Sequence, residues 1–140
     1  MSDNPSANIL AAGTDLKLEI TQSMKEFPHI VSVNRVTELK QIVDNDSEIE
    51  IGAAVSYEEA KSILVKHWPN LNSFLQRFAS LPIKNWATIG GNIANASPIG
   101  DMAPVLIALE SKLKLRKGDS SRVIALEDFF ISYKINNTIL

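Results

Sequence analysis

The chain has 140 residues, 45% of them hydrophobic, which is enough for one globular domain with a core. Its formal net charge is −2 at pH 7, and charges of both signs are interspersed without a basic stripe, which argues against a nucleic-acid partner. The absence of cysteine excludes disulfides, cysteine-ligated zinc, a catalytic thiol and an iron–sulfur cluster bound by this chain itself.

The first third of the sequence predicts strands around one helix. "ANILAA" (7–12) is an apolar run typical of a buried strand, and it leads into Gly13. Thr14 is placed to cap a helix through "TDLKLEITQSM" (14–24). "HIVSVN" (29–34) predicts a second strand, and the alternation in "EIEIGAAV" (48–55) predicts a half-buried one.

Helices dominate the middle, and a hairpin follows. Ser56 and Glu59 form a capping box for a helix that ends before Pro69. "NLNSFLQRFAS" (70–80) predicts another helix, and Asp101 is placed to cap an apolar, buried one. "KLKLRKGDSSRVIAL" (112–126) predicts two strands joined around Gly118 and Asp119.

Nothing in the pattern predicts a targeting segment, a membrane span or a metal site. No run of about 18 apolar residues occurs, and "MSDNPSANIL" lacks the basic and apolar regions of a signal peptide. His29 and His67 lack the spacing of metal ligands. We therefore expect a cytoplasmic protein without a metal of its own.

Two glycine loops suit a phosphate. "AAGTD" (11–15) lies between a strand and a helix, where backbone N–H groups are unpaired, and "TIGGN" (88–92) allows N–H groups to converge. Neither matches a Rossmann or P-loop motif. The alternatives stay open: an ordinary strand-to-helix turn, a hairpin corner at Gly90 and Gly91, and Asp101 as an N-cap only.

Three stretches resemble a known family. "ILAAGTDLKLEITQ", "FASLPIKNWATIGGNIANASPIGDMAPVLIAL" and "LKLRKGDSSRVIALEDFFISY" are similar to the FAD-binding domain of molybdenum hydroxylases, closest to the bacterial xanthine dehydrogenase small subunit. The likeness runs from about Ile9 to Tyr133, most of the chain. Ser97 and Pro98 favour the xanthine or aldehyde branch over the carbon monoxide dehydrogenase relatives. One departure is Ala12-Gly13, where the family usually has two glycines.

The resemblance implies FAD as the cofactor and assigns its contacts. Two loops would hold the pyrophosphate, an aromatic residue would lie beside the cofactor, and an acidic residue would contact FAD. It implies no catalytic acid or base and no metal ligand. The implied cofactor-binding residues are Ile9, Leu10, Ala11, Ala12, Gly13, Thr14, Asp15, Leu16, Phe78, Thr88, Ile89, Gly90, Gly91, Asn92 and Asp101.

The implied fold is α/β (α+β), a vanillyl-alcohol-oxidase (PCMH)-type FAD domain over residues 1–140, cut at both ends. We expect a small parallel sheet with helices in about 1–55, helices and a mostly antiparallel sheet in about 56–140, and FAD in the cleft between them.

The implied function is electron transfer within a xanthine dehydrogenase-like complex. Its partners would be an iron–sulfur domain or subunit, a molybdopterin-binding subunit, and NAD or another electron acceptor, with a homo-oligomer left open. This chain alone would not hydroxylate xanthine. The alternative is a non-enzymatic nucleotide-binding or assembly module that has lost flavin.

Overall fold

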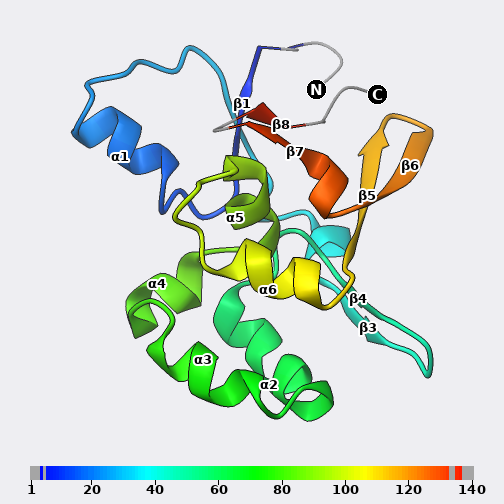
Figure 1. Ribbon diagram of the computed structural model, residues 1–140. Helices are drawn as coiled ribbons and strands as arrows, with labels where there is room; N and C mark the ends of the chain where they lie inside the picture. The colour runs from blue at the N-terminus through cyan, green and yellow to red at the C-terminus, as the bar shows by residue number, and fades with distance from the viewer. Residues whose placement is uncertain (1–3, 5, 133–134, 137–140) are drawn as a thin grey trace. The chain divides into compact units, whose positions relative to one another are not determined.

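The computed structural model describes residues 4, 6–132 and 135–136, which form two compact units (Figure 1). The first unit runs to Gly91, and the second begins at Asn92. The subdomain boundary expected near residue 55 stays a prediction.

The first unit opens with a strand, a helix and a parallel strand. β1 (Asn8–Leu10) pairs in parallel with β2 (Ile30–Ser32), and α1 (Leu16–Thr21) connects them. This is the small parallel sheet that the sequence predicts. The helix is shorter than expected because its end is exposed and β-branched, and the Thr21 hydroxyl bonds back to its own helix at Lys17 O (3.0 Å). Asp15, not Thr14, holds the N-cap position, without a side-chain bond.

A short hairpin follows. After the 3₁₀ turn η1 (Thr37–Lys40), β3 (Ile42–Asp44) and β4 (Ile49–Ile51) pair antiparallel. In β4 both isoleucines are half-buried and Glu50 is exposed, as the alternating sequence predicts.

Three helices and most of the core complete the first unit. The capping box of α2 (Tyr57–His67) is confirmed: Ser56 Oγ accepts from Glu59 N at 3.2 Å, and Glu59 Oε2 accepts from Ser56 N at 2.8 Å. α3 (Leu71–Arg77) and α4 (Leu81–Trp86) follow, and both contact α2. The fully buried side chains here include Val55, Tyr57, Ala60, Leu64 and Leu75.

The second unit combines helix and antiparallel strands. It contains most of α5 (Ile89–Asn95), then α6 (Met102–Ala108). The expected hairpin is confirmed as β5 (Lys112–Lys117) and β6 (Ser120–Ala125). A short turn η2 (Glu127–Phe129) leads to β7 (Phe130–Ser132), which pairs antiparallel with β8 (Ile135–Asn136). The buried apolar side chains of this unit are Ile93, Ala96, Met102, Leu106, Leu126 and Phe129.

Candidate functional site

The first glycine loop, residues 11–15, follows β1 directly. Across the described part of the chain, no backbone hydrogen bond has its donor in this loop. Gly13 has φ +77°, in the left-handed region that favours glycine, and its carbonyl accepts from Lys17 N at 3.1 Å. Successive free N–H groups around such a residue can converge on an anion.

The second glycine loop, residues 88–92, runs into a helix. Gly90 and Gly91 lie in the first turn of α5, so the hairpin-corner alternative is wrong. Residues 87–90 pair with residues 53–57, and this pairing includes a bridge between Ser56 and Thr88. The pairing positions the start of α5. Its own N–H groups are engaged: those of Ile89, Gly90 and Gly91 donate to Val55 O (3.0 Å), Ala53 O (3.0 Å) and Thr88 Oγ1 (3.1 Å).

The two loops come close at Gly91 and Ala11, which both belong to the first unit. A Cβ added to Gly91 would lie 3.9 Å from Ala11 Cβ and 2.7 Å from Thr88 Oγ1. A Cβ on Gly90 would instead meet backbone, at 2.7 Å from Ala53 O. Gly90 therefore allows close packing of two chain segments, and Gly91 is the glycine that faces the first loop.

Phe78 ends α3 in the same unit and packs among aromatic rings. It is half-buried; its ring lies edge-on to Tyr57 with centroids 4.8 Å apart, and stacks on Phe74 at 5.6 Å. Tyr57 also touches the segment before the second loop, because its N–H donates to Ala87 O at 3.1 Å. One residue thus links Phe78 to the second glycine loop.

Tyr57 is a residue that the sequence reasoning missed. It is 1% exposed, and its hydroxyl has no hydrogen-bond partner among the described residues. Burial raises the pKa of Tyr57 above its ordinary value. The sequence gives little sign of this burial. Tyr57 directly follows the capping residue Ser56, and a side chain at that position is ordinarily exposed.

Asn92 and Asp101 belong to the second unit. Asn92 Oδ1 is buried and accepts no hydrogen bond from any described residue. A Cβ on Gly100 would lie 3.8 Å from this oxygen. Asp101 holds the N-cap position of α6 with its side chain exposed, but it makes no side-chain capping bond, and the alternative of an N-cap only stays open. Both carbonyl and carboxylate oxygens therefore remain as acceptors.

Each unit by itself offers groups that suit one part of FAD, which combines an anionic diphosphate, hydroxyl groups and a large apolar ring. Free N–H groups at residues 11–15 suit the diphosphate, and the unpartnered Asn92 Oδ1 suits a hydroxyl donor. Among the described residues, no group of three or more His, Asp or Glu side chains could hold a metal ion.

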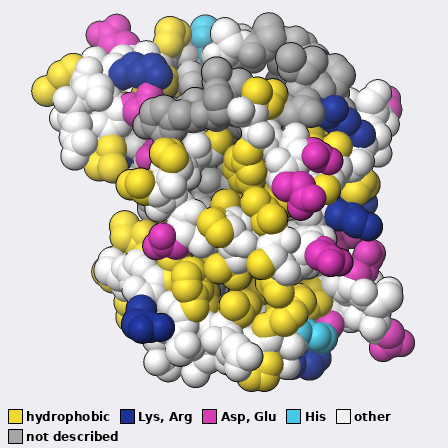
Figure 2. Space-filling view, in the orientation of Figure 1, with side chains coloured by type: hydrophobic (Ala, Val, Ile, Leu, Met, Phe, Trp, Pro, Cys, Tyr) yellow, Lys and Arg dark blue, Asp and Glu magenta, His cyan; other side chains and the backbone are white. Residues whose placement is uncertain are grey.

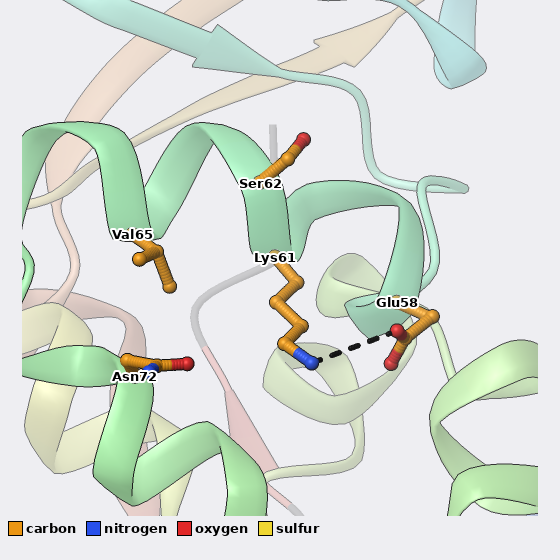
Figure 3. Close-up of a pocket in the computed structure, with 5 residues that line it drawn as sticks. All are labelled: Glu58, Lys61, Ser62, Val65 and Asn72. Atoms are coloured by element: carbon orange, nitrogen blue, oxygen red, sulfur yellow. Dashed lines mark ion pairs between the residues drawn. The ribbon is translucent and has the colours of Figure 1, made fainter.

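A shallow pocket elsewhere in the first unit involves none of these residues. Figure 3 shows it between α2 and α3, where the Glu58–Lys61 ion pair (3.8 Å) crosses its floor. Its lining is Glu58, Lys61, Ser62, Val65 and Asn72. It is open to solvent, and four of the five residues that line it are polar or charged, unlike the enclosed sites that hold cofactors.

Comparison with known proteins identifies the family. The model of the FAD binding domain in molybdopterin dehydrogenase matches residues 1–139. The chain belongs to this family. This confirms the resemblance and FAD as the cofactor of the domain.

Sequence relatives of this FAD-binding family include xanthine dehydrogenases. The xanthine dehydrogenase FAD-binding subunit of Escherichia coli O157:H7 is 30% identical over 132 residues, covering 92% of this chain and 45% of that subunit. The xanthine dehydrogenase of Drosophila pseudoobscura pseudoobscura is 31% identical over 151 residues, covering 96% of this chain and 11% of that enzyme. The chain thus spans less than half of each relative.

Solved structures confirm the expected α/β PCMH-type fold. A carbon monoxide dehydrogenase from Hydrogenophaga pseudoflava matches with TM-score 0.87 and 27% identity, over 94% of this chain and 47% of that one. For quinoline 2-oxidoreductase from Pseudomonas putida 86 the TM-score is 0.89 at 23% identity, over 97% of this chain and 48% of that one.

Within the described ranges, every helix is too short or too polar to span a membrane.

Proposed function

We propose that this chain is the FAD-binding, electron-transfer part of a cytoplasmic xanthine dehydrogenase-like molybdenum hydroxylase. FAD, when bound, supplies the redox chemistry: it accepts electrons from iron–sulfur clusters on another domain or subunit and passes them to NAD or another acceptor. Hydroxylation belongs to a molybdopterin-binding partner, so the chain alone does not oxidise xanthine. The family match over residues 1–139 is the observation that supports this proposal most.

The chain's own part is binding and orientation. In this proposal the free N–H groups of residues 11–15 bind the diphosphate, and Gly91 leaves room for it beside Ala11. The N–H groups of Ile89, Gly90 and Gly91 are already paired, so this loop serves mainly as a rigid wall. Asn92 Oδ1 and the Asp101 carboxylate accept hydrogen bonds from hydroxyl groups of FAD, and Phe78 contacts the flavin ring.

The first experiment identifies the chromophore. The full-length protein is purified and denatured, and the released chromophore is identified by chromatography. We expect FAD. Release of FMN would refute the assignment, and a folded protein that neither contains nor takes up flavin would favour a nucleotide-binding or assembly module instead.

A matched pair of glycine variants then tests the first loop. Gly13→Ala forces an L-residue to φ +77°, so the loop relaxes, and we expect FAD affinity to fall about tenfold or more. Gly118→Ala is the control, because Gly118 has φ +59° in the β5–β6 turn and a Cβ there meets nothing within 4 Å. A Cβ on Gly13 also lies 2.8 Å from Leu10 Cδ1, so Gly13→Ala should lose more stability than Gly118→Ala. FAD affinities are therefore compared at a temperature at which both variants are folded, and only Gly13→Ala should lose FAD. Equal FAD affinities would show that the loop does not hold the diphosphate.

A further inference from the structure

α4 (Leu81–Trp86) buries a charged side chain and exposes apolar ones, the reverse of an ordinary amphipathic helix. Lys84 is its only buried residue, at 7% exposure. Its apolar side chains are outside: Leu81 is 58% exposed, Ile83 43% and Trp86 64%. Figure 2 shows hydrophobic side chains at the surface around α2 to α4. Burying a lysine ammonium costs free energy unless a hydrogen-bond acceptor or an opposite charge compensates for the lost hydration. The partner of Lys84 therefore indicates its structural role.

The partner is the end of α3. Lys84 Nζ donates to Leu75 O at 3.0 Å in a buried environment. No described backbone N–H donates to this carbonyl, because Phe78 is extended (φ −67°, ψ 121°) and turns the chain out of the helix before Ala79. A cation suits the negative end of a helix. Among the described residues no carboxylate lies within 4.0 Å of Lys84, and residues 60–100 contain no Asp or Glu.

The same lysine closes the turn that contains Phe78. Its backbone N–H donates to Ser80 O at 2.9 Å, and its side chain reaches back to Leu75 O at 3.0 Å. The three residues between α3 and α4 are therefore held at both ends. Phe78 enters this turn with its N–H bonded to Phe74 O at 2.8 Å.

α4 also leads into the second glycine loop. Ala87 N donates to Ile83 O at 2.7 Å, and Ala87 O accepts from Tyr57 N at 3.1 Å. Tyr57 in turn lies against the Phe78 ring. Phe78 and the loop at 88–92 are thus joined through one short helix, whose only buried anchor is Lys84.

We propose that Lys84 is a positioning residue for FAD: through Leu75 O it sets where the Phe78 ring stands relative to the second glycine loop. This rests on the proposed function, in which Phe78 contacts the flavin. Lys84 does not itself touch the cofactor, so its loss should weaken the flavin half of FAD more than the ADP half. Such a split would not follow from a general loss of stability.

The test measures FAD and ADP affinities of the full-length protein and its variants by titration. Lys84→Met keeps a long unbranched chain without the donor; we expect FAD to bind about tenfold more weakly and ADP to change by less than about threefold. Lys84→Arg, which keeps a cationic donor, should recover most of the FAD affinity. Lys61→Met is the control, because Lys61 is partly exposed on α2 and, within the described ranges, forms an ion pair with Glu58 alone.

Each result decides one of the two proposals. A wild type that binds ADP but not FAD overturns the proposed function. A wild type that binds FAD, with a folded Lys84→Met variant that loses both ligands equally or neither, overturns only the role of Lys84. Should that variant not fold, hydrogen exchange of residues 75–86 in the wild type decides: stronger protection by FAD than by ADP supports the role, and equal protection overturns it.

Discussion

Removing the hydroxyl of Tyr57 should make the protein more stable. The side chain is 1% exposed, and its oxygen has no partner among the described residues. An unsatisfied buried polar group costs about 1–3 kcal/mol. Tyr57→Phe keeps the ring against Phe78, so we expect the free energy of unfolding to rise by about 1 kcal/mol and Tm by about 4 °C.

The same variant should change the alkaline limb of the stability curve. Burial raises the pKa of Tyr57 in the folded state, so the unfolded chain releases this proton first, near its ordinary value of about 10. Stability is therefore fully present below pH 10 and falls as pH rises through the folded-state pKa. Between pH 9 and 11 the wild type should lose about 1 kcal/mol more than Tyr57→Phe, because only its unfolded state releases the proton in this range.

Urea unfolding of both proteins at pH 7, 9 and 11, followed by far-UV circular dichroism, measures both effects. Tyr57→Leu is the control: it also removes the hydroxyl but loses the ring contact with Phe78 (4.8 Å), so it should be less stable than the wild type. A Tyr57→Phe variant less stable than the wild type at pH 7 would show that the hydroxyl has a partner, such as an ordered water, and would refute the reasoning.

Three further substitutions test the framework of the first unit. Ser56→Ala removes the N-cap of α2 and should lower the unfolding free energy by about 1 kcal/mol, measured by urea unfolding, whereas Ser62→Ala on the exposed side of the same helix should not. Asp44 pairs with Lys66 (2.6 Å) and His67 (3.0 Å), and these hydrogen bonds lower its pKa. The ionised Asp44 therefore contributes to the free energy of unfolding above a pH of about 4, and this contribution is lost as pH falls through its folded-state pKa. Asp44→Asn should make stability depend less on pH in acid unfolding at low salt, and identical curves for the two proteins would contradict this. Gly90→Ala places a Cβ 2.7 Å from Ala53 O and should cost about 1–3 kcal/mol in thermal unfolding, and an unchanged Tm would show that the two segments can separate freely.

Elements with local signals were predictable from the sequence, and those set by tertiary pairing were not. The capping box at Ser56 and the hairpin around Gly118 follow from short-range chemistry, and the structure has both. Gly90 and Gly91 disfavour a helix, yet α5 begins there because their segment pairs with residues 53–55. No local pattern encodes that pairing.

The candidate site divides in the same way. The first loop was predictable because a strand, Gly13 and a helix follow one another in the sequence. The engagement of the Gly91 N–H by Thr88 was not, and neither was the unpartnered oxygen of Asn92, because both depend on how the chain folds around them. The roles of the individual residues toward FAD stay predictions.

The inverted packing of α4 has a consequence for the order in which the chain folds. Hydrophobic collapse would direct Leu81, Ile83 and Trp86 inward, so it cannot set the orientation that the helix finally has. That orientation depends on a carbonyl that becomes available only when α3 has formed and ended. We therefore expect α4 to dock late, so that Lys84→Met speeds unfolding and leaves the refolding rate nearly unchanged. Stopped-flow refolding measures this, and a variant that refolds slowly would place α4 in the folding nucleus instead.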